Sequence, residues 1–199
     1  MRFALVKLRR YGCDMTPRPK PRRNAEATRA RILAAAQSSF VQAGYDHTGI
    51  RDVAAAADVS STLVLRYFGS KAGLYEAALV ASVPLDSVLA TERPRFGEHL
   101  AAIFLRQELD VSPPVLIGVT TGDTEARAIT TRVMETQLIG PLAAWLGGPQ
   151  ARERAIEIAM LATGFVIYAR QLPLAPGGAS EQPVVEWFAG AVQAIVDAG

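Results

Sequence analysis

Two basic residues in the first half of the chain could bind phosphate or base groups of a nucleic acid. Arg66 offers a planar guanidinium that matches a phosphate or the acceptor edge of guanine. Lys71 follows Ser70, a typical capping residue, and therefore lies in the first turn of a predicted helix. Free N–H groups and the helix dipole favour phosphate there. Both residues predict binding of a polyanion.

Patterns for catalysis and for metal binding are much weaker. The only histidines, His47 and His99, fall in different predicted domains, and the only cysteine is Cys13. A single cysteine excludes an internal disulfide and a multi-cysteine zinc site, and it favours the reducing cytoplasm. A triad of Ser60, His47 and Asp58 can be drawn, but no hydrolase, P-loop or dinucleotide motif accompanies it. We therefore expect no enzyme, no catalytic residue, no metal and no cofactor.

The charge is distributed unevenly along the 199 residues. Residues 1–31 contain ten lysines and arginines and two acidic residues, a formal charge of +8, whereas the whole chain carries +2. The rest is therefore acidic. A basic arm before an acidic body is typical of nucleic-acid binding, with an anionic membrane surface as the competing interpretation. No uninterrupted apolar run of about 18 residues predicts a membrane span.

Residues 1–23 are predicted to be a flexible basic arm. Proline alternates with basic residues from Thr16 to Arg23, which disfavours a helix. The apolar run Phe3–Val6 is too short for a secretory signal. Since the sequence from Thr16 onward has the composition of an ordinary arm, we expect Met15 to be the translation start.

Apolar residues then follow the helical period. The first predicted helix covers about 25–43, with Asn24 as N-cap and Gly44 as C-cap. Thr48 and Ser60 are expected to cap two short helices, 48–57 and 61–68, and a fourth helix runs from 71 to about Val83, where Pro84 stops it. The tight turn between the short helices predicts a helix-turn-helix. One face of 61–68 is left free for a DNA major groove.

The motifs in this region are an alanine-rich helix ending in Phe40 and Gly44-Tyr45, then Ile50-Arg51-Asp52-Val53-Ala54, Val59-Ser60 through Tyr67-Phe68, Ser70-Lys71 and Leu74-Tyr75. In this order and spacing they resemble the TetR family of bacterial repressors, over Thr28–Leu79. The resemblance implies an all-α homodimer that binds double-stranded DNA. Ser61, Thr62 and Leu65 would face bases, Arg51 would reach a base or phosphate, and Thr48, Leu63, Arg66, Tyr67 and Lys71 would lie by the DNA backbone.

Three positions of the third helix depart from the family pattern. The family usually has glycine or proline in place of Thr62, threonine in place of Leu63 and an aromatic residue in place of Leu65. Because leucine cannot donate a hydrogen bond, contact with bases at Leu63 and Leu65 should be apolar, with thymine methyl groups.

The rest of the chain is predicted to be helical, in segments near 96–109, 114–121, 125–146, 150–172 and 183–198. By resemblance, the last two helices would form the dimer interface, and a small effector would bind between helices of this bundle. The interface candidates are Ile156, Met160, Thr163, Gly164, Ile167, Trp187, Val192 and Ile195. The pocket candidates are Phe104, Met134, Leu138, Phe165 and Tyr168, which favour an apolar effector.

The predicted fold class is therefore all-α, with a three-helix helix-turn-helix domain followed by a helical bundle for effector binding and dimerisation. The predicted divisions are an arm at 1–23, the DNA-binding domain at 24–83 and the bundle at 84–199. The predicted function is a ligand-responsive, homodimeric repressor of a palindromic operator, in the cytoplasm and without a membrane partner. The alternative is a helical module for small molecules or proteins whose DNA-binding domain is vestigial.

Overall fold

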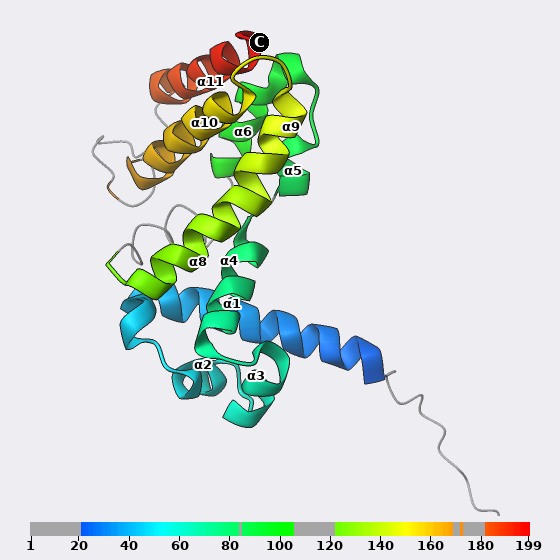
Figure 1. The fold of residues 1–199 in the computed structure, drawn as a ribbon, viewed down its shortest axis with the longest axis vertical. Helices are drawn as coiled ribbons and strands as arrows, with labels where there is room; N and C mark the ends of the chain where they lie inside the picture. The colour runs from blue at the N-terminus through cyan, green and yellow to red at the C-terminus, as the bar shows by residue number, and fades with distance from the viewer. Residues whose placement is uncertain (1–20, 84, 106–121, 169–171, 173–181) are drawn as a thin grey trace, which may run out of the picture.

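The computed structural model describes residues 21–83, 85–105, 122–168, 172 and 182–199, and all regular elements in these ranges are helical. Figure 1 shows an elongated molecule in which α2 and α3 lie at one end and α10 and α11 at the other. The elements are α1 (Pro21–His47), α2 (Ile50–Ala56), α3 (Ser61–Phe68), α4 (Lys71–Ser82), α5 (Leu85–Leu89), the 3₁₀ turn η1 (Arg93–Arg95), α6 (Phe96–Leu105), α8 (Thr124–Met134), the π-helical turn η2 (Glu135–Ile139), α9 (Gly140–Leu146), α10 (Ala151–Val166) and α11 (Gln182–Asp197).

The predicted all-α fold class is confirmed, and α1 differs from the prediction at its start but breaks at the predicted Gly44. The helix begins at Pro21, inside the predicted arm, because proline has no N–H to lose at the first helical position. At the other end Gly44 adopts φ 76° and ψ 173°, which breaks the helical path before His47. The sequence prediction also missed α5 and η1. The predicted segment 114–121 lies outside the described residues, and the division of domains at residue 84 stays a prediction.

The N-terminal helices enclose one apolar core, to which α8 contributes. Ile32 and Phe40 of α1, Val64 of α3 and Tyr75 of α4 are all completely buried in it. The residues that α8 adds are Ala126, Ile129 and Val133. By length and composition the stretch Lys71–Leu89 could cross a membrane. However, the buried side chains of α4 pack in this core, as expected for a core helix of a folded domain.

A second core lies between α6, α9, α10 and α11, and α8 leads into it. Figure 1 shows α8 running from the N-terminal helices toward α9, with η2 joining the two. The prediction of one helix over 125–146 did not include the π-helical turn. Pro141 explains it, because proline lacks the N–H that would continue the α-helical ladder and its ring crowds the preceding turn.

One charged side chain, Arg154 of α10, is buried beside this second core, with only 5% of its surface exposed. Its guanidinium donates to the carbonyl of Gly147, and to the carbonyls of Ile195 and Val196 at 3.4 Å each. Gly147 and Gly148 both have positive φ, which lets the chain turn sharply between α9 and α10. Arg154 thus joins the ends of α9 and α11, where helix carbonyls lack partners.

Candidate nucleic-acid interface

The turn between α2 and α3 holds the two short helices against α1. Asp58 adopts φ 50°, a left-handed conformation that asparagine and aspartate tolerate better than most residues. The Ser60 hydroxyl then accepts a hydrogen bond from the Leu63 N–H at 3.2 Å and caps α3, as predicted. Val64 points into the core on the inner side of α3. The opposite side of the helix therefore faces away from the protein.

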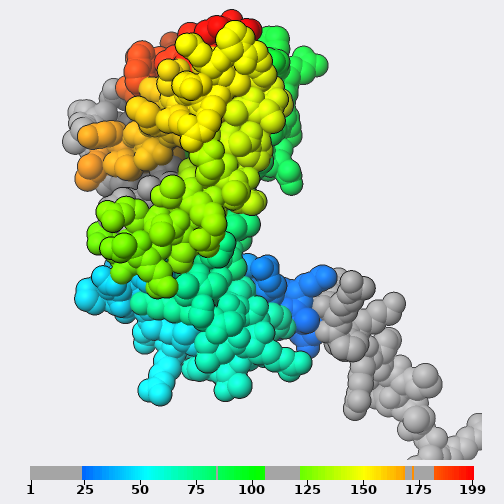
Figure 2. All heavy atoms as spheres, in the orientation of Figure 1, coloured from blue at the N-terminus to red at the C-terminus, as the bar shows by residue number. Residues whose placement is uncertain are grey.

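The structure leaves that outer side of α3 accessible. Thr62, Leu65 and Arg66 are exposed, Ser61 and Leu63 are half-buried, and α3 carries no acidic residue. Arg51 is exposed in the first turn of the neighbouring α2. Figure 2 shows that this surface of α2 and α3, in cyan to green, forms the end of the molecule opposite the C-terminal helices in yellow to red. The arrangement can place hydroxyl, guanidinium and apolar groups in a DNA groove.

Thr48 is used differently from the prediction. Its side chain is buried, and its hydroxyl donates to the carbonyls of Gly44 at 2.7 Å and Ser39 at 3.1 Å. The N-cap of α2 is Gly49, whose N–H donates to the Asp52 carboxylate at 2.9 Å. The Thr48 hydroxyl therefore binds two backbone carbonyls of α1 beside the break at Gly44, and its predicted place by the DNA backbone stays a prediction. This corrects the predicted capping of α2 by Thr48.

Tyr67 and Lys71 make contacts within the protein that the sequence did not indicate. The Tyr67 hydroxyl donates to the Ala25 carbonyl at 3.3 Å and ties α3 to the start of α1. The Lys71 ammonium donates to the Asp46 carbonyl at 3.2 Å and lies 4.4 Å from the centre of the Tyr45 ring. Contacts of both residues with the DNA backbone stay predictions.

Sequence models of known families match both parts of the chain. The model described as bacterial regulatory proteins, tetR family, matches residues 32–78. The model described as the tetracyclin repressor-like C-terminal domain matches residues 95–196, which is half of the chain. The chain belongs to the TetR family. It is therefore a DNA-binding transcriptional regulator and not an enzyme, as predicted.

Solved structures of TetR-family proteins share the fold along almost the whole chain. A regulator from Rhodococcus sp. superposes with a TM-score of 0.68 at 17% identity, covering 86% of this chain and 100% of that one. NalD from Pseudomonas aeruginosa, the secondary repressor of the MexAB-OprM multidrug efflux pump, gives 0.61 at 20% identity, with coverages of 85% and 96%. A regulator from Streptomyces coelicolor gives 0.54 at 26% identity, with coverages of 91% and 98%. No curated protein sequence matches the chain.

In this TetR-family chain, polar contacts connect α8 to the DNA-binding helices. The Tyr45 hydroxyl donates to the Glu125 carboxylate at 2.5 Å, and the hydroxyls of Tyr75 and Thr130 are hydrogen-bonded at 2.8 Å. Next to these contacts, the side chains of Asp46 and Asp123 are hydrogen-bonded to each other. Their shared hydrogen bond and mutual repulsion raise the pKa of Asp46, while the Ala126 N–H lowers the pKa of Asp123. A shift of α8 would therefore act directly on the end of α1.

Tyr45 gives this connection a predicted pH dependence. Burial first, and then the Glu125 carboxylate, raise the pKa of the Tyr45 phenol above its ordinary value. The unfolded tyrosine ionises near pH 10 while the folded one stays neutral, so the unfolded state releases the proton first. Stability should therefore fall as the pH rises above about 10. Tyr45→Phe should cost about 1 kcal/mol at pH 7 and flatten the loss at alkaline pH.

The measurement is urea denaturation at pH 8 and at alkaline pH for the wild type, Tyr45→Phe and Tyr168→Phe. Tyr168 is 59% exposed, so it serves as the control tyrosine. An alkaline loss of stability in Tyr45→Phe as large as in the wild type would contradict the assignment.

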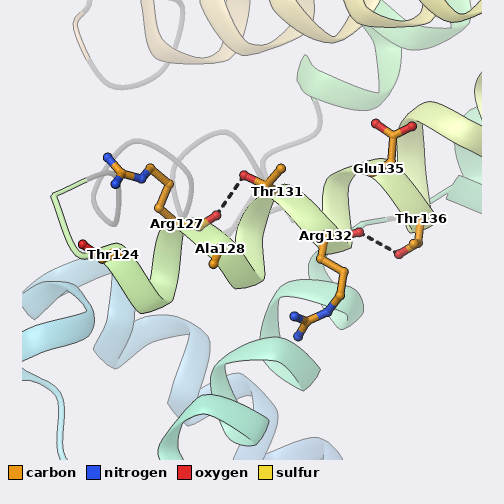
Figure 3. A pocket seen from close by; sticks show the side chains of 7 residues that line it. All are labelled: Thr124, Arg127, Ala128, Thr131, Arg132, Glu135 and Thr136. Atoms are coloured by element: carbon orange, nitrogen blue, oxygen red, sulfur yellow. Dashed lines mark hydrogen bonds between the residues drawn. The ribbon is translucent and has the colours of Figure 1, made fainter.

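The predicted pocket residues differ in burial, and their role in binding an effector stays a prediction. Phe104 and Phe165 are buried in the second core, where both pack against Phe188. Met134 and Leu138 are half-buried, and Tyr168 is exposed. An open hollow also lies along α8, lined by Thr124, Arg127, Ala128, Thr131, Arg132, Glu135 and Thr136. Figure 3 shows Arg132 pointing away from Arg127 and Thr131, toward α4, where it pairs with Glu76 at 2.9 Å.

The predicted dimer residues divide into exposed and buried groups. Met160 of α10 and Trp187 of α11 are 66% and 61% exposed. Val192 is completely buried in the core of its own chain, so it cannot contact a second copy, which corrects the prediction for this residue. The remaining candidates are half-buried: Ile156, Thr163, Gly164, Ile167 and Ile195. Val184, which the sequence analysis did not name, adds another exposed apolar side chain on α11.

Proposed function

We propose that this regulator is a homodimeric, ligand-responsive repressor that binds a palindromic operator in the cytoplasm. The observation that carries the proposal is the free outer face of α3, which combines exposed Thr62, Leu65 and Arg66 beside the exposed Arg51 of α2. Two such faces, related by a two-fold axis, would enter successive major grooves about 34 Å apart. The proposed base contacts are Ser61, Thr62 and Leu65, with Arg51, Leu63, Arg66, Tyr67 and Lys71 at bases or phosphates.

The exposed apolar residues of α10 and α11 support dimerisation. TetR-family regulators typically act as dimers and bind small effectors. Large side chains such as Met160 and Trp187 favour burial, and the two helices pack side by side at one end of the molecule (Figure 1). A second copy of the chain would cover them and fix the spacing of the two α3 helices.

The ligand response is proposed to act through α8. This helix contributes to the core of the DNA-binding helices and continues through η2 into α9. An effector that binds between α6, α8 and α10, near the predicted residues Phe104, Met134, Leu138, Phe165 and Tyr168, would favour one position of α8. It would thereby favour a dimer whose α3 helices no longer match the two grooves.

The first experiment is the selection of bound sequences from random duplex DNA, followed by titration of the selected operator at several salt concentrations. We expect a palindromic operator, two chains per duplex and an affinity that falls steeply with salt. With about six phosphate contacts, the affinity should fall roughly a thousandfold between 50 and 200 mM salt. Failure to enrich any sequence, together with no duplex binding at low salt, would contradict the proposal and favour a helical module with a vestigial DNA-binding domain.

A further inference from the structure

The outer face of α3 has an apolar centre. Ser61, Thr62, Leu65 and Arg66 lie on this face at helical spacing, whereas Val64 and Phe68 pack toward the core on the other side. Leu65 is 44% exposed although it lies in the middle of the helix. Its polar neighbours on the face can donate hydrogen bonds to bases or phosphates, but Leu65 cannot.

The major groove offers one apolar group to such a side chain. Guanine, cytosine and adenine present acceptors and amino donors at their groove edges, whereas thymine adds a C5-methyl group. A leucine placed against an amino or carbonyl edge would remove water from that group without replacing its hydrogen bond, which costs free energy. A leucine placed against a methyl buries two apolar surfaces together.

Leu65 is better placed than Leu63 to make this contact. Leu63 is half-buried, and Leu65 is exposed between the hydroxyls at the start of α3 and the guanidinium of Arg66. We propose that Leu65 makes each operator half-site selective for thymine by packing against its C5-methyl group. This inference rests on the proposed function, since it requires α3 to lie in the major groove.

The test replaces thymine with deoxyuridine, which keeps the hydrogen-bonding edge and removes only the methyl group. In the operator obtained by selection, each thymine and its symmetry mate are replaced in turn, and the affinity is measured. At one position the wild type should lose about fourfold for each methyl removed, or roughly sixteenfold for both half-sites.

Two variants separate the methyl contact from other effects. Leu65→Ala should bind the thymine and deoxyuridine operators equally, while Leu65→Met, which keeps an apolar side chain of similar reach, should retain a preference for thymine. Val80→Ala is the matched control, because Val80 is a 39% exposed apolar residue of α4 outside this face. It should retain the full sixteenfold preference.

The outcomes distinguish this inference from the proposed function. An operator that is bound with steep salt dependence but is indifferent to every deoxyuridine substitution would overturn the role of Leu65 and leave the proposed function intact. A preference for thymine that persists unchanged in Leu65→Ala would also overturn it. If no duplex were bound at all, the proposed function and this inference would both fall.

Discussion

Replacing Arg154 with methionine is expected to lower the free energy of unfolding by about 3 kcal/mol. The buried guanidinium donates to carbonyls at the ends of α9 and α11, and methionine fills similar space without donating. The carbonyls would then lack partners away from water, and the positive charge beside two helix C-termini would be lost. For a chain of this size the melting temperature should fall by roughly 6–12 °C.

Arg152 provides a matched control one half-turn earlier on the same helix. Its guanidinium is exposed and pairs with Glu135 at 2.9 Å, so Arg152→Met should cost less than about 1 kcal/mol. Thermal and urea unfolding followed by circular dichroism give both values. Arg154→Lys should be intermediate, since an ammonium keeps the charge but cannot reach all the carbonyls that a planar guanidinium reaches. Equal destabilisation by Arg152→Met and Arg154→Met would contradict the proposed role of Arg154.

The burial of Arg154 also shows what the sequence could and could not predict. Ser60 and Ser70 cap α3 and α4 as predicted, because capping depends on a hydroxyl and an N–H three residues later. Arg154 directly follows the charged residues Arg152 and Glu153, which is typical of a solvent-facing surface. Arg154 is buried because α9 and α11 end beside it. The local sequence around Arg154 does not indicate that these two helix ends lie there.

The same distinction separates the exposures that the sequence could predict from the internal contacts that it could not. The exposure of Arg51, Thr62 and Leu65 follows from the helical period, since the core residues Val53, Ala54 and Val64 occupy the opposite faces of α2 and α3. The bond from Tyr67 to Ala25 joins residues 42 positions apart, and Thr48 is buried because α1 breaks at Gly44. The hydrogen bond of Tyr67 and the burial of Thr48 both depend on the position of an end of α1, which the local sequence does not show.

The predicted dimer and pocket residues show where sequence alone cannot predict burial, namely in helices with two apolar sides. A sequence shows that Val192 and Trp187 are apolar, but both a core and an interface select such residues. The packing of α11 against α6 and α10 separates the buried Val192 from the exposed Trp187. Phe104 and Phe165 are similarly placed by their common contact with Phe188.

The double variant Arg51→Ala/Arg66→Ala is expected to lower operator affinity at least a hundredfold and to leave the fold unchanged. Each charged hydrogen bond is worth about 1.5–3 kcal/mol, and each substitution removes one contact in both protomers. Neither guanidinium forms an ion pair with another described residue, and both are exposed, so unfolding should change by less than about 0.5 kcal/mol. Lys71 is less suitable, because its contact with Tyr45 also supports the fold.

The control must remove the same charge from a distant surface. Arg95→Ala/Arg152→Ala does so, because both residues are exposed and belong to the helices beyond α4. Where the two arginines of α2 and α3 contact phosphates, their loss should also reduce the log–log salt slope, by about 0.9 for each phosphate contact removed, whereas the control pair should keep the wild-type slope. If the control pair weakened binding as much as the α2–α3 pair, attraction by overall charge would explain the affinity. The face of α3 would then have no special role in docking.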